Sequence, residues 1–266
     1  MTAAAVELLD PATEFANRRA VVTGGTRGIG RAIADRLRAG GATVLAVARS
    51  MPEDLPPDSV VVADIASPGG TDVVVRAATE RLRGVDILVH NAGGAGQNGG
   101  GATAISDEEW SATFNQNFFG AVRLDRALIP AMVEAGDGAI VHVTSIQRRA
   151  PLPTTLPYAA AKAALANYSK ALSNELAPQG IRVNAVAPGY IETQSAYQMA
   201  AEFADINDIS VDEARQQIMT SIGGIPLGAP GRPRDIAELV AFLVSERAAY
   251  ITGTEHVIDG GSLRSV

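Results

Sequence analysis

The stretch Thr23-Gly24-Gly25-Thr26-Arg27-Gly28-Ile29-Gly30 decides the fold of this chain. It joins an apolar run at residues 19–23, which predicts a β-strand, to a helix-period pattern at residues 29–39. Glycines at Gly24, Gly28 and Gly30 permit a tight turn, and they let backbone N–H groups and the helix N-terminus approach a phosphate. The spacing is G-x-x-x-G-x-G rather than the commoner G-x-G-x-x-G, so the motif alone predicts either an anion-binding turn or an ordinary strand-to-helix connection.

Strand-like and helix-like segments alternate along the rest of the chain. Short β-rich runs occur at residues 19–23, 43–48, 59–62, 86–90, 139–144, 182–187 and 255–258. Helix-period stretches lie between them at residues 29–39, 71–82, 119–134, 158–176 and 234–245. Apolar strands separated by helices indicate a parallel sheet covered on both faces. We therefore predict an α/β fold, a doubly wound (Rossmann-type) parallel sheet of about seven strands with ligands beyond the strand carboxyl ends.

The predicted domain organisation is a short extension at residues 1–16 followed by one domain at residues 17–266. Two segments interrupt the alternation. The glycine-rich residues 93–101 follow a strand directly, and they predict either a mobile loop beside the site or a tolerated surface insertion. Residues 194–228 are acidic and weakly helical, so we expect a substrate lid, with a fixed pair of packed helices as the alternative.

Composition excludes several classes of function. The 266 residues carry a net charge of −7 and a pI near 5.0 with no evident basic patch, which argues against nucleic-acid binding. There is no cysteine, so disulfides and thiol chemistry are absent, and His90, His142 and His256 are scattered on strand-like runs, which predicts structural roles and no metal site. No secretory signal and no membrane-spanning run of roughly 20 apolar residues is seen. We expect a soluble, cytoplasmic protein that does not bind membranes.

Three polar residues downstream predict proton chemistry. Tyr158 and Lys162 are four residues apart in a helix-period stretch, so they share one helix face, and Ser145 ends the strand at residues 139–144. A free tyrosine titrates near pH ~10, and an ammonium group beneath the hydroxyl would favour its ionised form. Tyr-x-x-x-Lys is also common by chance, and it gains weight here from the glycine turn and the placed serine.

In this combination of motifs the chain resembles the single-domain short-chain dehydrogenases/reductases, from about residue 17 to residue 261. The matching elements, in order, are Thr23–Gly30, Asp64-Ile65, Asn91-Ala92-Gly93, Asn117-Phe118-Phe119-Gly120, Ser145, Tyr158-x-x-x-Lys162, Pro188-Gly189 with Thr193, and Asp259-Gly260-Gly261.

The resemblance implies a nicotinamide cofactor and assigns residues to it. Gly24, Thr26, Gly28, Ile29 and Gly30 would hold the pyrophosphate, and Arg27 inside the turn could add a contact to a 2′-phosphate. Asp64 and Ile65 would flank the adenine; Asn91, Ala92 and Gly93 would line the ribose; Pro188, Gly189, Ile191 and Thr193 would fix the carboxamide. The plainer interpretations are a helix cap at Asp64 and turns at Asn91-Ala92-Gly93 and Pro188-Gly189.

The second strand predicts which nicotinamide cofactor is used. An NAD site places Asp or Glu at the end of that strand to accept from the ribose 2′-hydroxyl. This chain reads Val47-Ala48-Arg49-Ser50 instead, so a guanidinium stands where a carboxylate would repel a 2′-phosphate. We predict NADP(H) in preference to NAD(H), with a solvated strand-end charge as the alternative role of Arg49.

By the same resemblance, Tyr158 would be the acid in reduction and the base in oxidation, and Ser145 would polarise or orient the carbonyl. Lys162 would bind the nicotinamide ribose and favour the phenolate. Asn117 would hold a water that joins Lys162 to solvent; Asn115 competes for that role, and the following Phe118-Phe119-Gly120 favours Asn117.

The sequence therefore predicts an oxidoreductase that interconverts a ketone and a secondary alcohol with NADP(H), acting on a small-molecule carbonyl or alcohol and assembled as a homotetramer. Two alternatives remain open: an NAD-dependent alcohol, sugar or steroid dehydrogenase working in oxidation, and a non-catalytic nucleotide-sensing protein. Gln147 and Arg148 follow Ser145 closely and would either contact a polar substrate or face solvent.

Overall fold

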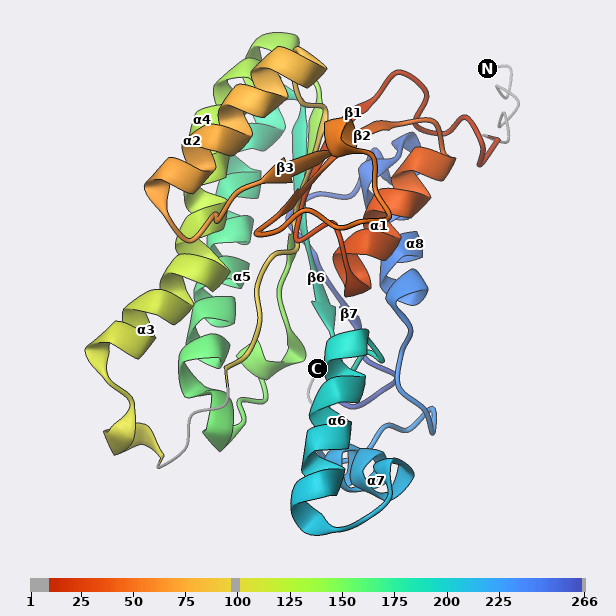
Figure 1. The fold of residues 1–266 in the computed structure, drawn as a ribbon. Helices are drawn as coiled ribbons and strands as arrows, with labels where there is room; N and C mark the ends of the chain where they lie inside the picture. The colour runs from red at the N-terminus through yellow and green to blue at the C-terminus, as the bar shows by residue number, and fades with distance from the viewer. Residues whose placement is uncertain (1–9, 97–100, 265–266) are drawn as a thin grey trace.

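A twisted parallel sheet forms the centre of the molecule (Figure 1). The computed structural model describes residues 10–96 and 101–264. In this part of the chain the strand order is β3-β2-β1-β4-β5-β6-β7, so the winding direction changes between β1 and β4. The strands are β1 (Arg19–Thr23), β2 (Thr43–Ala48), β3 (Val60–Val62), β4 (Ile87–His90), β5 (Gly138–Val143), β6 (Ile181–Pro188) and β7 (Glu255–Ile258). The fold class predicted from the sequence is confirmed.

Helices cover both faces of the sheet (Figure 1). On one face α1 packs against α8, and their apolar side chains form one core with those of β1, β4 and β5. On the other face α2, α4 and α5 close a second core. The helices in the described residues are α1 (Gly28–Ala39), α2 (Pro68–Ala77), α3 (Asp107–Phe114), α4 (Gly120–Ala135), α5 (Leu156–Leu176), α6 (Gln194–Asn207), α7 (Val211–Ser221) and α8 (Pro233–Val244).

Two helical regions differ from the sequence prediction. The helix expected at residues 71–82 begins earlier, at Pro68, because the Ser67 hydroxyl accepts from the Gly70 N–H and caps it. It continues beyond Ala77 as a π-helical turn. Helix α3 was not predicted; it buries none of its residues, so it shows no clear apolar period, although Ser106 and Glu109 form a capping box at its start.

Helices α6 and α7 form a lobe that projects beyond the carboxyl ends of the strands (Figure 1). Their buried residues are small: Ala200, Ala204 and Ala214. The lobe covers the residues for which the sequence predicts either a lid or a packed pair of helices, and its two helices are better formed than the weak helical pattern indicated.

The start of the described chain packs onto the domain. Phe15 lies in the core beneath α1, and Glu14 forms ion pairs with Arg36 and Arg247. Residues 1–9 of the predicted extension and residues 97–100 of the predicted mobile loop lie outside the described residues. Within the described ranges, no helix is long and apolar enough to cross a membrane.

Candidate active site

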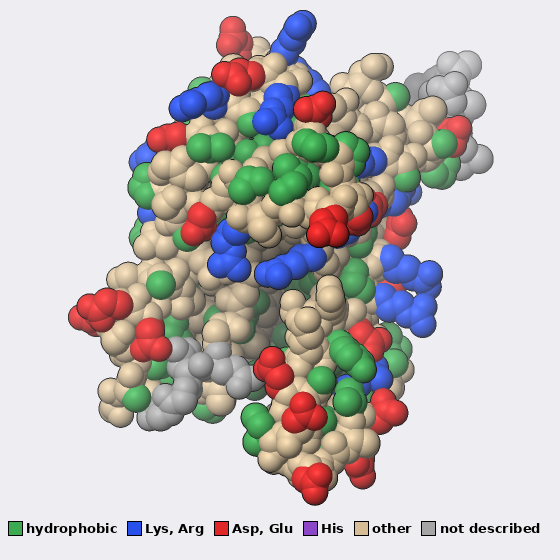
Figure 2. Space-filling view, in the orientation of Figure 1, with side chains coloured by type: hydrophobic (Ala, Val, Ile, Leu, Met, Phe, Trp, Pro, Cys, Tyr) green, Lys and Arg blue, Asp and Glu red, His purple; other side chains and the backbone are tan. Residues whose placement is uncertain are grey.

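A cleft of about 880 Å³ opens at the carboxyl ends of the strands and reaches the first turn of α6. Figure 2 shows the hollow between the body of the molecule and the lobe of α6 and α7, with basic side chains along its upper rim and acidic ones on the lobe. The sequence-predicted residues that line the cleft are Gly24, Thr26, Arg27, Gly28, Ile29, Arg49, Asp64, Ile65, Asn91, Ala92, Gly93, Ser145, Tyr158, Lys162, Pro188, Gly189, Ile191 and Thr193. Gly30 and Asn117 are not part of the lining.

The glycine turn after β1 is so tight that there is no room for side chains at two of its glycines. Gly24 has φ +64°, and a Cβ on Gly30 would lie 2.2 Å from the Gly24 carbonyl oxygen, so neither position accepts a side chain. The Asn91 amide donates to the Thr23 carbonyl oxygen at 3.0 Å, and the Thr23 hydroxyl accepts from the Asn91 N–H. Asn91, which directly follows the neighbouring strand β4, therefore fixes the turn. Glycines of the turn present backbone without side chains to the cleft.

Two arginines stand beside this turn with free guanidinium groups. Arg27 and Arg49 are exposed, line the cleft, and form no ion pair within the described residues. Asp64, on the same side, accepts from the Ala66 N–H at 3.0 Å and is not the cap of α2, which is Ser67. The helix-cap interpretation of Asp64 is therefore wrong.

Ser145 begins the turn that follows β5. It is buried, and its hydroxyl accepts from the Gln147 N–H at 3.2 Å. The same hydroxyl hydrogen bonds to Tyr158, at the start of α5. The structure thus brings together the two hydroxyls that the sequence separates by thirteen positions.

The environment of Tyr158 differs from the expectation of a phenolate favoured by Lys162. Burial raises the pKa of Tyr158, and the hydrogen bond from Ser145 opposes that rise. Lys162 Nζ lies 5.7 Å from the centroid of the Tyr158 ring and donates to the Val143 carbonyl oxygen at 2.8 Å. Burial also lowers the pKa of Lys162 to about 8. The protein groups around Tyr158 therefore favour the neutral phenol, the form that an acid in ketone reduction requires.

Asn117 lies in a π-helical turn, Asn115–Phe119, just behind the lining of the cleft. It is buried, its amide oxygen accepts from the Gly94 N–H at 3.0 Å, and its amide nitrogen donates to the Thr113 carbonyl oxygen. A Cβ on Gly93 would meet both Asn117 Oδ1 and Lys162 Nζ, so these two groups approach the same point. Asn115 lines the cleft, but its amide oxygen accepts from Arg123 and its amide nitrogen donates to the Ser111 carbonyl oxygen, so both ends of its side chain already have partners.

The segment after β6 borders the opposite side of the cleft. Thr193 caps α6 by accepting from the Ala196 N–H, and its methyl group would meet a Cβ on Gly28 at 3.3 Å. The Gly189 N–H donates to the Ile258 carbonyl oxygen, and a Cβ on Gly189 would lie 2.6 Å from that of Asp259. The glycine of Pro188-Gly189 therefore lets the C-terminal Asp259-Gly260-Gly261 motif pack against this segment.

A buried cluster beneath the site was missed in the sequence, where the histidines look scattered. His90 Nε2 lies 2.7 Å from Asp125 Oδ1, and His142 Nε2 lies 3.2 Å from Asp125 Oδ2. Burial opposes ionisation of Asp125, but the two imidazoles hold its pKa well below the usual range. The sequence carries no direct signal of this cluster, because His90 and His142 lie opposite each other only once β4 and β5 are known to pair.

The two imidazole rings stack at 4.8 Å with only 9° between their planes. A ring nitrogen that faces an ionised carboxylate carries the hydrogen, so the two Nε2–H groups donate to separate oxygens of Asp125 and present no lone pairs there to a shared ion. The cluster fits a carboxylate held by two imidazoles better than a metal site.

Gln147 and Arg148 have partners inside the protein. The Thr155 hydroxyl donates to Gln147 Oε1, and Arg148 pairs with Glu255 of β7. The alternative in which Arg148 faces solvent is wrong, because its guanidinium is held by a carboxylate and is mostly buried.

Several known proteins are similar to this chain in sequence. A family profile described as enoyl-(acyl carrier protein) reductase matches residues 24–262. The 3-oxoacyl-[acyl-carrier-protein] reductase FabG of Vibrio cholerae serotype O1 is 36% identical, covering 91% of this chain and 96% of that protein. A putative ketoacyl reductase of Streptomyces coelicolor is also 36% identical, over 91% of this chain and 95% of its own length. The chain belongs to the short-chain dehydrogenase/reductase family.

The same likeness extends to solved structures. L-sorbose reductase from Gluconobacter frateurii, in complex with NADPH and L-sorbose, has a TM-score of 0.89 and 33% identity, and covers 96% of this chain and 100% of that one. Aldohexose dehydrogenase from Thermoplasma acidophilum has a TM-score of 0.85 at 27% identity, over 94% and 95% of the two chains. This chain is an oxidoreductase that acts between C=O and CH–OH groups.

Proposed function

We propose that the protein is an NADP(H)-dependent reductase of small ketones, with Tyr158 as the general acid. The observation that carries this proposal is a single cleft. It combines two guanidinium groups, unpaired in the described part of the chain, beside a glycine turn with a hydrogen-bonded serine–tyrosine pair. The guanidinium groups suit a 2′-phosphate, and the two hydroxyls suit a developing alkoxide.

The residues present fit a dinucleotide. The backbone of the glycine turn offers N–H groups and the helix N-terminus to a pyrophosphate. A Cβ at Gly24 or Gly30 would clash with the Asn91 amide, so the tight turn requires glycine at both positions. Arg49 and Arg27 would hold the 2′-phosphate, and Lys162 would hold the ribose hydroxyls. When bound, the reduced nicotinamide supplies the hydride.

The chain's own groups provide the proton and the charge stabilisation. As the carbonyl carbon is reduced, negative charge grows on its oxygen, and the Ser145 hydroxyl donates to it. Tyr158 transfers its proton to the same oxygen, which yields the alcohol. Lys162 stabilises the resulting phenolate, and Asn117 holds the water through which a proton returns.

Two substrate classes follow from the relatives. L-sorbose is a free polyhydroxy ketone, and a 3-oxoacyl thioester is a ketone borne on a carrier. The cleft is lined by small and polar residues, among them Gly94, Ala95, Gln116 and Gln194. We propose a small free ketone, since such a substrate needs no docking surface outside the cleft.

A carbonyl screen paired across cofactors tests the proposal. Purified protein is given NADPH or NADH with a panel of ketoses, simple ketones and 3-oxoacyl thioesters, and loss of absorbance at the reduced nicotinamide band is followed. We expect turnover of a free ketone with NADPH well above that with NADH.

Each alternative has its own outcome in that screen. Preferential oxidation of alcohols with NAD would support the dehydrogenase, and tight cofactor binding with no turnover of any compound would support the nucleotide-sensing protein.

A further inference from the structure

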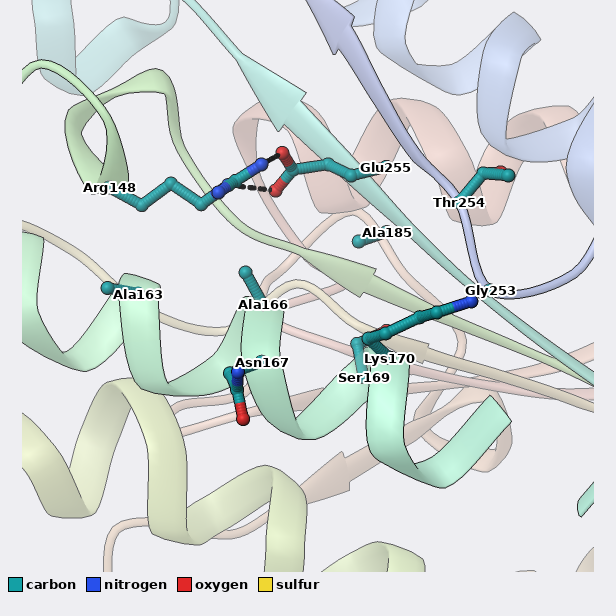
Figure 3. A pocket seen from close by; sticks show the side chains of 10 residues that line it. All are labelled: Arg148, Ala163, Ala166, Asn167, Ser169, Lys170, Ala185, Gly253, Thr254 and Glu255. Carbon is teal, nitrogen blue, oxygen red and sulfur yellow. Dashed lines mark hydrogen bonds and ion pairs between the residues drawn. The ribbon is translucent and has the colours of Figure 1, made fainter. Parts of the chain in front are cut away.

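An ion pair connects the edge strand β7 to the turn that carries Ser145. Figure 3 shows Arg148 and Glu255 pointing toward each other at one end of a cavity, with two interactions between them. Arg148 Nε donates to Glu255 Oε1, and the Arg148 terminal nitrogen pairs with Glu255 Oε2, a bidentate arrangement. The two side chains are only 19% and 11% exposed.

Glu255 gathers further donors from the same turn. The Thr144 hydroxyl lies 2.9 Å from Glu255 Oε1, and Arg149 lies 3.6 Å from Oε2. Thr144 and Arg149 flank Ser145 and Arg148 in the sequence. One carboxylate on β7 therefore holds the residues on either side of Ser145, reaching across β6 to do so.

Two hydrogen bonds within the turn connect its backbone to Ser145. The Arg148 N–H donates to the Ser145 carbonyl oxygen at 3.2 Å, and the Gln147 N–H donates to the Ser145 hydroxyl at 3.2 Å. If Arg148 lost its carboxylate, the turn would be free to open, and the Ser145 hydroxyl would lose its fixed direction toward Tyr158.

Hydrophobic packing does not explain the presence of the Arg148–Glu255 ion pair. It borders a cavity of about 360 Å³ beside α5 rather than either apolar core, and Lys170 and Asn167 line the same cavity. A partly buried ion pair adds little net stability, because desolvation offsets most of its attraction. What such a pair supplies is a fixed geometry.

We propose that Glu255 is a positioning residue for the reaction, and that it acts through Arg148 to hold Ser145 against Tyr158. This inference rests on the proposed function, since it assigns a purpose to the Ser145 hydroxyl. Glu255 itself does not line the cleft.

The proposal predicts a change at Tyr158 that mere loss of stability would not cause. The Ser145 hydrogen bond lowers the pKa of Tyr158 against the effect of burial. Lys162 approaches Tyr158 from its own helix, and His142 lies nearby on β5. Because Glu255→Gln leaves those groups in place, a rise in the pKa of Tyr158 in that variant would be due to Ser145.

The test is a double-mutant cycle between Glu255→Gln and Ser145→Ala. The protein is labelled with ¹³C at the hydroxyl-bearing ring carbon of its tyrosines, and the Tyr158 resonance is identified by its loss in Tyr158→Phe. We expect Glu255→Gln and Ser145→Ala each to raise the pKa of Tyr158, and the double variant to match Ser145→Ala. In the ketone assay, Glu255→Gln should lower kcat by about tenfold in the wild-type background and leave Ser145→Ala unchanged.

Two further variants control for folding. Arg148→Lys keeps the charge but loses the bidentate fork, so it should reproduce the effect of Glu255→Gln on Tyr158. Asp86→Asn breaks the other bidentate pair, Arg19–Asp86, at the opposite end of the sheet, and should leave the Tyr158 resonance and kcat unchanged.

The proposal is overturned if Glu255→Gln leaves the Tyr158 pKa unchanged, or if it shifts that pKa further in the Ser145→Ala background. The titration needs no substrate. Failure of the proposed function would appear separately, as absence of turnover by the wild-type protein.

Discussion

Lys162 and Tyr158 divide the chemistry of the site between binding and proton transfer. Tyr158→Phe removes only a hydroxyl, so it should abolish ketone reduction, by at least about a hundredfold, while NADPH binding stays near wild type. Lys162→Met should lose both activity and affinity for NADPH, because the ammonium would also hold the ribose. Rates and fluorescence titration of NADPH measure the two effects, with the fully exposed Tyr250→Phe as control. A near-wild-type rate for Tyr158→Phe would sink the mechanism.

The buried ammonium of Lys162 also makes stability depend on pH. Burial lowers its pKa from 10.5 to about 8, so between these values the unfolded chain binds a proton that the folded one has released. The buried charge therefore lowers the free energy of unfolding by its full amount below pH ~8, and this destabilisation decreases as the pH rises. Relative to Lys162→Met, the cofactor-free wild type should gain about 1 kcal/mol between pH 7 and pH 9, toward a limit of about 3 kcal/mol. Denaturant unfolding at several pH values measures this; a difference that does not vary with pH contradicts it.

Arg49 is the residue from which we predict cofactor preference. Its guanidinium is exposed in the cleft and unpaired within the described chain, so it is available to a 2′-phosphate. Arg49→Asp should weaken NADPH binding by about 2–4 kcal/mol, through loss of a charge-assisted contact and added repulsion, and should reverse the order of NADPH and NADH.

The matched control for Arg49→Asp is Arg76→Asp, an exposed arginine on α2 outside the cleft lining. It makes the same change in net charge, so it should leave the preference intact. Equal affinity of the wild type for NADH and NADPH would show the assignment to be wrong.

At the scale of elements, the sequence predicted the features that depend on residues close together in the chain. The glycine turn between β1 and α1 and the pair Tyr158 and Lys162 are local patterns, and the strand ends differ from the prediction by one residue at most. Contacts between residues that are far apart in the sequence leave no local pattern from which they could be predicted. Arg148 and Glu255 are 107 positions apart, and Asp125 meets His90 and His142 from a different element. Those contacts appear only once the strand order is known.

The lobe of α6 and α7 is the element on which our prediction of motion rests. It buries only small side chains, and Gly223 and Gly224 at its end both have positive φ. Arg215 of α7 pairs with Glu192, next to Thr193, which joins the lobe to the cleft. An element with so little buried surface opens at low free-energy cost.

Hydrogen exchange compares the free protein with the NADPH-bound and NADPH–ketone-bound forms. We expect residues 194–228 to exchange rapidly when free and more slowly in each complex, while β5 stays protected throughout. Strong and equal protection of the lobe in all three states would identify it as fixed structure, the alternative noted in the sequence.

At the scale of the whole molecule, the described sheet has two edge strands, the short β3 and β7. β7 is the last strand beside β6, so its outer backbone groups have no partner strand within the described chain. Exposed apolar side chains lie on this strand and on the loop before it: Val257 and Tyr250. An uncovered strand edge with apolar neighbours favours association with another copy.

We expect a homotetramer built on two-fold axes, with the β7 edge buried between subunits, because closed symmetric assemblies leave no such edge exposed. Light scattering at micromolar concentration should give about four times the chain mass of 27.5 kDa. Val257→Lys places a charge on the outer part of β7, so it should lower the measured mass toward that of a smaller assembly. Val73→Lys, on the exposed face of α2, adds the same charge away from that edge and should leave the mass unchanged. A wild-type monomer at this concentration would contradict the prediction, and a stable tetramer of Val257→Lys would move the interface away from β7.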